Sequence, residues 1–229
     1  MSKRIIWLVL TSALACAAEQ PLIYATTGVD GSIWGIDPEA GKIVANIPVN
    51  PTEGAYGIAF SPDGKRIYVA GGATLSVVDA ADYSVKRMDL GSSGFSGVMV
   101  SPDGRWVFAS NSKEVVAVDS TTLKPVRSFA VSFFVGVTTD STRLVGATNG
   151  WDVYAFDIRS GQRVAWLPDD EAFLGVALAP DSRRLYPVMD NGGCSEDFTS
   201  PARLEIFDLA TSERISVLRV DGFLDTSAE

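Results

Sequence analysis

Short apolar stretches alternate with polar turns along most of the chain, and residues 61–70 show the pattern most clearly. In this stretch Pro62 fixes the φ angle of one turn position, and Gly64 tolerates the positive φ of a later one. The residues from Arg66 to Ala70 include Ile, Tyr and Val, which favour a β-strand. The stretch therefore predicts a tight turn followed by a short strand.

The same turn and strand recur three more times, at residues 101–110, 138–147 and 179–188. Successive turn aspartates are separated by 40, 37 and 41 residues, at Asp63, Asp103, Asp140 and Asp181. The third copy is the most altered, because Thr139 and Ser141 replace the proline and glycine of the turn. A period near forty residues indicates a repeat architecture.

Each repeat contains four segments with strand-like composition, which we name A to D in chain order. Strand A is predicted at 57–60, 97–100, 134–138 and 175–178, and strand B at 66–70, 106–110, 143–147 and 184–189. Strand C is predicted at 75–79, 115–119, 153–157 and 204–208, and strand D at 84–90, 125–130, 162–167 and 213–220. Three earlier segments, 22–26, 33–37 and 42–49, predict a first repeat that lacks strand A.

Every strand C ends in an aspartate that precedes a polar hairpin: Asp37, Asp79, Asp119, Asp157 and Asp208. An Asp side chain can accept hydrogen bonds from backbone N–H groups two residues later, which closes such a turn. Turn formation therefore explains these five carboxylates better than catalysis does. Basic residues that follow the A–B turns, Lys65 and Arg66 among them, are interpreted as part of a solvated rim of mixed charge.

Four-stranded antiparallel repeats of about forty residues are typical of the blades of a β-propeller. We therefore expect an all-β fold with about five blade equivalents over residues 19–229. Residues 220–224 resemble the start of a strand A and would supply the strand that the first blade lacks. The expected architecture is a closed five-bladed ring or a truncated part of a seven-bladed one. An open ring would expose an apolar sheet face and favour self-association.

The first two repeats resemble the YVTN-type β-propeller repeat. The resemblance is carried by Ile23-Tyr24-Ala25-Thr26-Thr27 with Asp30-Gly31-Ser32, and by residues 57–70. Related propellers occur in surface-layer and other exported proteins, and in the β-subunit of quinohaemoprotein amine dehydrogenases. The resemblance implies an exported propeller, either acting alone or beside a partner chain that carries a redox cofactor. It is specific for fold and says little about function.

The N-terminus has the features of a secretory signal peptide, predicted to span residues 1–18. Lys3 and Arg4 precede an apolar run that is too short to cross a bilayer, and small residues follow it. Cleavage after Ala17 or Ala18 is expected, and lipidation of Cys16 is the less favoured alternative. The mature protein is therefore expected in a bacterial periplasm or outside the cell.

Composition excludes several kinds of chemistry. Removal of Lys3 and Arg4 lowers the formal net charge from −9 to −11, which disfavours binding to nucleic acid. The sequence has no histidine, which excludes Ser-His-Asp catalysis, histidine-ligated metals and covalent haem attachment. After cleavage Cys194 is the remaining cysteine, and it is either a free thiol or a link to another chain. We expect no catalytic residues, no metal and no cofactor in this chain.

The first candidate site is a set of aromatic residues, one near the start of each strand A: Tyr56, Phe95, Phe134, Phe173 and Phe223. In propellers the D–A and B–C loops share one face, so repeat logic places these rings together at the mouth of the channel. They would form a platform for a ligand or for a partner's loop. The alternative, which we favour, is that they close the inner end of the core.

The second candidate site is the irregular loop at 190–201, which separates strands B and C of the last repeat. The loop does not match an EF-hand. It nevertheless contains four oxygen-bearing side chains of the type that calcium binds: Asp190, Asn191, Glu196 and Asp197. Long loops of this kind are either functional or merely mobile. Calcium binding is the less favoured of these interpretations.

Three functions are compatible with these features. The preferred one is a non-catalytic exported propeller that binds a protein partner or a small ligand. The second is an accessory subunit of a periplasmic oxidoreductase, similar to amine dehydrogenase, with the cofactor on a partner chain. The third is a lactonase-like hydrolase, which ranks lowest because no acid–base pair stands out from the turn aspartates.

Overall fold

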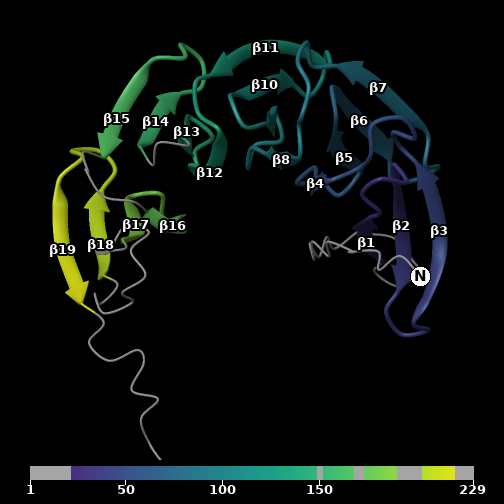
Figure 1. The fold of residues 1–229 in the computed structure, drawn as a ribbon, viewed down its shortest axis with the longest axis horizontal. Helices are drawn as coiled ribbons and strands as arrows, with labels where there is room; N and C mark the ends of the chain where they lie inside the picture. The colour runs from purple at the N-terminus through teal and green to yellow at the C-terminus, as the bar shows by residue number, and fades with distance from the viewer. Residues whose placement is uncertain (1–21, 149–151, 168–172, 190–202, 220–229) are drawn as a thin grey trace, which may run out of the picture. The chain divides into compact units, whose positions relative to one another are not determined.

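The computed structural model describes residues 22–148, 152–167, 173–189 and 203–219, and these residues form strands and turns without any helix (Figure 1). None of these described segments therefore provides a helix that could cross a membrane. The strands are β1 (Ile23–Thr26), β2 (Ser32–Asp37), β3 (Lys42–Pro48), β4 (Gly57–Phe60), β5 (Arg66–Gly71), β6 (Thr74–Asp79), β7 (Val85–Asp89), β8 (Gly97–Val100), β9 (Trp106–Ser110), β10 (Val115–Asp119), β11 (Lys124–Phe129), β12 (Phe133–Val137), β13 (Arg143–Ala147), β14 (Val153–Asp157), β15 (Arg163–Leu167), β16 (Phe173–Leu178), β17 (Arg184–Met189), β18 (Arg203–Asp208) and β19 (Arg214–Arg219).

The strands pair with their neighbours in sequence to form five antiparallel sheets. The first sheet is β1-β2-β3, and the others are β4-β5-β6-β7, β8-β9-β10-β11, β12-β13-β14-β15 and β16-β17-β18-β19. This order is the A-B-C-D order predicted from the sequence, and the first sheet lacks strand A among the described residues, as predicted. The candidate for that missing strand, at 220–224, lies outside the described residues.

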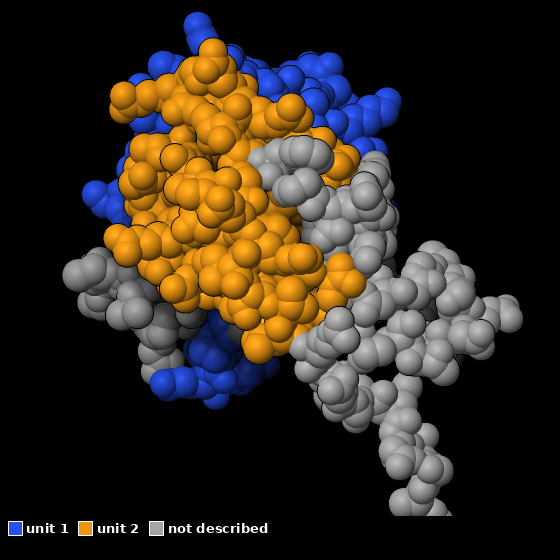
Figure 2. Space-filling model, turned by 90° about the vertical axis from the view of Figure 1, so that its left-hand side faces the viewer, with its two compact units in different colours: residues 1–130 blue, residues 131–229 orange. Residues whose placement is uncertain are grey.

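The chain divides into two compact units, residues 1–130 (unit 1) and residues 131–229 (unit 2) (Figure 2). Unit 1 contains the first three sheets, from β1 to β11, and unit 2 contains the last two, from β12 to β19. Within each unit the sheets follow one another along the chain (Figure 1).

The second sheet shows how the sheets of unit 1 share their cores. Val69 belongs to an apolar cluster with Ile33 of the first sheet, and the adjacent Tyr68 belongs to a cluster with Val107 of the third sheet. Successive side chains of a strand point to opposite faces, so β5 packs against a neighbouring sheet on each side. This two-sided burial explains why strand B is almost entirely apolar. In unit 2, Val145 and Phe207 similarly join the fourth and fifth sheets.

The turn aspartates have the structural role that the sequence predicts. In the A–B turn of the second sheet, the hydroxyl of Ser61 donates to Asp63 Oδ1 at 2.6 Å, and the same oxygen accepts the N–H of Lys65 at 3.1 Å. In a C–D hairpin, Asp119 Oδ1 accepts the N–H groups of Thr121 and Thr122 at 3.0 and 2.8 Å. The remaining described turns repeat these patterns, at Asp37, Asp79, Asp103, Asp140, Asp157, Asp181 and Asp208.

Hydrogen bonds within the turns lower the pKa of several of these carboxyl groups. The hydroxyl of Thr138 is the main cause of the lowered pKa of Asp140, and the backbone N–H of Thr122 is the main cause for Asp119. A carboxyl group with a lowered folded-state pKa stabilises the protein above its unfolded pKa. This contribution is lost as the pH falls through the folded-state value.

The Asp140→Asn variant tests this linkage, because it removes the charge that Thr138 and Thr142 stabilise. We expect the variant to be less stable than the wild type at pH 7. The difference should shrink below about pH 4, where the aspartate of the unfolded chain begins to take up a proton. Urea unfolding between pH 7 and pH 2 measures this difference. A difference that is constant over the whole range would contradict the assignment.

Candidate functional site

The D–A and B–C loops of unit 1 lie on one face and are held together by backbone hydrogen bonds. The N–H of Gly28, in the B–C loop of the first sheet, donates to the carbonyl of Ala55 at 3.0 Å. The N–H of Ala55 donates back to Gly28 at 2.8 Å. The same relation recurs one blade later, where the N–H of Phe95 donates to the carbonyl of Gly72 at 2.8 Å. The sequence pattern predicts that these loops lie together, and within unit 1 they do.

The aromatic residues predicted on this face differ in exposure. Tyr56 is 39% exposed, whereas Phe95 is 1% exposed and packs in the core cluster of the second and third sheets. Phe134, in unit 2, is half-buried. The position of Phe95 agrees with the alternative in which these rings close the core. The side chain of Phe173 and the whole of Phe223 lie outside the described residues, so the aromatic platform stays a prediction.

The 190–201 loop also lies outside the described residues. The state of Cys194 therefore stays a prediction. The same holds for the four predicted calcium ligands of the loop: Asp190, Asn191, Glu196 and Asp197. Elsewhere, the residues that the structure describes contain no cluster of three or more acidic or cysteine side chains able to hold a metal ion.

An exposed apolar side chain that the sequence analysis missed lies in the B–C loop of the first sheet. Val29 is 82% exposed, and it follows Gly28, the residue that is bonded to the segment leading into Tyr56. The aromatic ring of Tyr56 approaches Gly28, since a Cβ added to Gly28 would lie 4.0 Å from Tyr56 Cε1. We call Val29 and Tyr56 the apolar platform of unit 1. No repeat position corresponds to Val29, so the repeat pattern gave no signal for it.

Polar side chains beside the apolar platform fix the loops in place. Glu53 Oε2 accepts the N–H of Ala73 at 2.9 Å and the hydroxyl of Thr74 at 3.0 Å, which ties the D–A loop to the next B–C turn. Both hydrogen bonds lower the pKa of the Glu53 carboxyl group, and the bond from Ala73 has the larger effect. The buried side chain of Asn50 donates from Nδ2 to the carbonyl of Gly71 at 2.9 Å. The loops are therefore preorganised.

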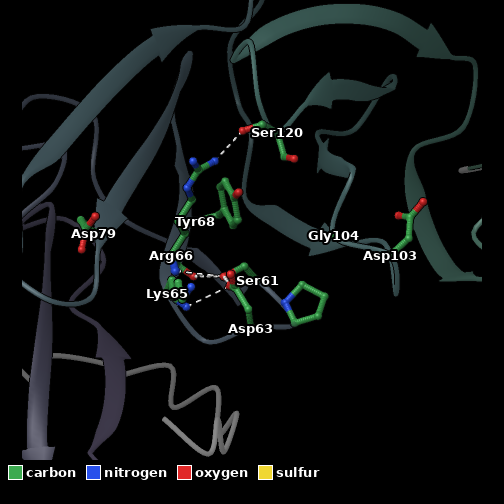
Figure 3. A pocket seen from close by; sticks show the side chains of 10 residues that line it. Ser61, Asp63, Lys65, Arg66, Tyr68, Asp79, Asp103, Gly104 and Ser120 are labelled. Atoms are coloured by element: carbon green, nitrogen blue, oxygen red, sulfur yellow. Dashed lines mark hydrogen bonds between the residues drawn. The ribbon is translucent and has the colours of Figure 1, made fainter. Parts of the chain in front are cut away.

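A second candidate site lies within unit 1 at the A–B turns of the second and third sheets (Figure 3). It is a cleft of about 410 Å³, which we call the turn cleft. Its lining residues are Ser61, Pro62, Asp63, Lys65, Arg66, Tyr68, Asp79, Asp103, Gly104 and Ser120. The sequence predicts a solvated rim at Lys65 and Arg66 and gives no sign of the cleft.

Unit 2 contains a buried carboxylate that the sequence analysis also missed. Glu205 on β18 is completely buried. Its Oε1 accepts hydrogen bonds from Nε–H of Arg203 at 2.7 Å and from Nη1–H of Arg214 at 3.1 Å. Its Oε2 has no hydrogen-bond partner among the described residues. The available signal was a repeat mismatch, because the other C strands have Trp34, Ser76, Val116 or Tyr154 at the corresponding position.

The similarity of this chain to known proteins is limited to the fold. No family model matches the chain, and no curated protein does. Among solved structures, a hydrazine synthase chain from Kuenenia stuttgartiensis matches with a TM-score of 0.69 and 20% identity. The alignment covers 87% of this chain and 62% of that one, so this chain spans less than two thirds of its length. The fold is that of a β-propeller.

The propeller fold by itself does not select among the candidate sites. As many as 1366 chains of solved structures match significantly, so the fold is shared widely, and function in such folds resides in local sites. In this propeller the described candidates are the apolar platform, the turn cleft and the buried Glu205 group.

Proposed function

We propose that the chain is a non-catalytic propeller module that binds a partner protein through the D–A and B–C loop face of unit 1. The observation that carries the proposal is the apolar platform. Val29 and Tyr56 expose apolar surface on two loops that are bonded to each other through Gly28 and Ala55. Preorganised loops lose little conformational entropy on binding, which favours recognition.

The chemistry of the carboxylates supports a non-catalytic role. A general acid or base at neutral pH needs a pKa near 7. The turn carboxylates whose pKa values are shifted have lowered values, because backbone and hydroxyl groups donate to them: Asp63, Asp82, Asp119, Asp140, Asp157 and Asp208. They therefore remain ionised as structural groups. The sequence offers no histidine to replace them.

Photo-crosslinking tests the binding face. The residue p-benzoylphenylalanine is incorporated at position 29 or, as a control, at position 126 on the outer strand β11, where Val126 is also exposed. The variants are expressed in the source bacterium, irradiated and analysed for crosslinked proteins by mass spectrometry. We expect one specific partner from position 29 and none from position 126. Equal products from both positions, or none from position 29, would overturn the proposal.

We also propose that the protein is exported and belongs with the YVTN-type propellers. The motives are the signal-like residues 1–18 and the motif of residues 57–70. N-terminal sequencing of the native protein tests export directly, with a new terminus expected at Ala18 or Glu19. A native protein that retains Met1 would contradict it.

An accessory role beside an oxidoreductase is the second candidate function. The structure that matches in fold is named for an enzyme, hydrazine synthase. The repeat motif of the sequence also resembles that of an amine dehydrogenase subunit. A partner chain would then supply the cofactor. This candidate predicts that the protein crosslinked at position 29 carries a redox cofactor, which absorption spectroscopy of the purified complex detects. A partner without a cofactor would leave the first proposal standing and remove the second.

A further inference from the structure

The turn cleft of unit 1 has walls from two blades. The second sheet contributes the A–B turn that contains Pro62 and the start of β5, and the third sheet contributes Gly104 and Ser120 (Figure 3). The guanidinium of Arg66 spans the blades, because Nη1 donates to the carbonyl of Ser120 at 2.7 Å. The two turns also touch, since a Cβ on Gly104 would lie 3.3 Å from Cδ of Pro62. The cleft is therefore preformed by contacts that fix both walls.

The buried side chain of Tyr68 lines the cleft. The residue is 1% exposed as a whole, and its side chain forms part of the cleft wall. In Figure 3 the ring of Tyr68 lies beside Arg66, below Ser120. The hydroxyl of a tyrosine both donates and accepts hydrogen bonds, so Tyr68 offers a polar group to a ligand in the cleft.

The charges around the cleft select the class of ligand. Lys65 and Arg66 bring positive charge, whereas Asp63, Asp79 and Asp103 bring negative charge. A free anion would meet three carboxylates and a free cation would meet two basic groups, so neither is strongly attracted. A neutral ligand with several hydroxyl groups can donate to the carboxylates and accept from the basic and hydroxyl groups.

From these observations we propose that the turn cleft binds a small neutral saccharide, with the Tyr68 hydroxyl as a direct hydrogen-bonding group. The volume of about 410 Å³ lies in the range of small-molecule sites. The apolar faces of Tyr68 and Pro62 offer surface for the C–H groups of a sugar ring. The site involves none of the residues of the apolar platform, so the two proposals stand or fall separately.

The test uses the mature protein and a panel of neutral sugars: glucose, galactose, mannose, N-acetylglucosamine, maltose and cellobiose. Binding is measured by isothermal titration calorimetry and by backbone amide shifts, with glucose 6-phosphate and glucosamine as charged probes. We expect at least one neutral sugar to bind, with shifts at Gly104 and Ser120, and to bind better than the charged probes. No binding of any neutral sugar at 20 mM, or preference for a charged probe, would overturn the proposal.

Two conservative variants separate a direct contact from a general effect on folding. Tyr68→Phe removes the hydroxyl and keeps the ring, so the core is preserved, and we expect it to weaken sugar binding about fivefold or more. Tyr154→Phe makes the same change on β14 of unit 2 and should leave the affinity within twofold of the wild type. An affinity that Tyr68→Phe does not change would contradict the role of this hydroxyl, even if a sugar binds.

Discussion

Replacement of Phe95 by alanine is expected to destabilise unit 1 by about 3–5 kcal/mol, which is the usual cost of removing a buried phenylalanine. The ring is 1% exposed and packs with Tyr68 and Val107 in the core between the second and third sheets. Its loss leaves a cavity that these rigid sheets cannot close. Urea unfolding followed by circular dichroism measures the effect.

Tyr56→Ala is the control, because Tyr56 is the aromatic residue of the D–A loop one blade earlier and is 39% exposed. Its cost should be about 1 kcal/mol or less, since surface substitutions are usually mild. The pair therefore separates a core aromatic from a binding aromatic. A Phe95→Ala variant as stable as Tyr56→Ala would contradict the core assignment of Phe95.

Replacement of Glu205 by glutamine is expected to destabilise unit 2 by about 3 kcal/mol, because removal of one partner leaves an uncompensated buried charge. The uncompensated charge is that of Arg203, whose side chain is 16% exposed and whose Nε lies 2.7 Å from Glu205 Oε1. The half-exposed Arg214 is screened by water and should contribute about 0–1 kcal/mol. Urea unfolding at low and high salt measures the loss.

Glu213→Gln provides the control, because it makes the same chemical change at an exposed position of the same hairpin. Its free energy of unfolding should stay within about 0.5 kcal/mol of the wild type. A combined Glu205→Leu and Arg203→Met variant should recover much of the loss, since apolar replacement of a whole buried pair is often neutral. Equal stability of the two glutamine variants would show that the buried pair contributes nothing.

The strands were predictable because the signals that set them are local. Apolar stretches between polar turns gave β4, β8 and β9 with the observed bounds, and the turn aspartates fixed the register between repeats. The structural interpretation of those aspartates is also confirmed, since Asp63 and Asp119 accept the backbone N–H groups of their own turns.

The candidate sites were less predictable because they depend on contacts between blades. Tyr56 and Phe95 lie in successive D–A loops, but the hydrogen bonds place Phe95 at the repeat position of the buried Ala55, and Tyr56 is one residue further along. The spacing of 39 residues therefore hid a shift of one position between the two rings. The turn cleft joins Arg66 to Ser120, which are 54 residues apart, and no spacing rule brings that pair together. The repeat alignment shows Glu205 as a mismatch, but only the folded hairpin shows that Arg203 and Arg214 are its partners.

The apolar platform can be tested most directly by the affinity of the partner that crosslinks at position 29. The measurement is the dissociation constant of that partner for the wild type and for a Val29→Ser, Tyr56→Ala double variant, by calorimetry on the mature protein. We expect the dissociation constant to increase about tenfold or more, as is usual for loss of central apolar contacts. A dissociation constant within twofold of the wild-type value would contradict the account.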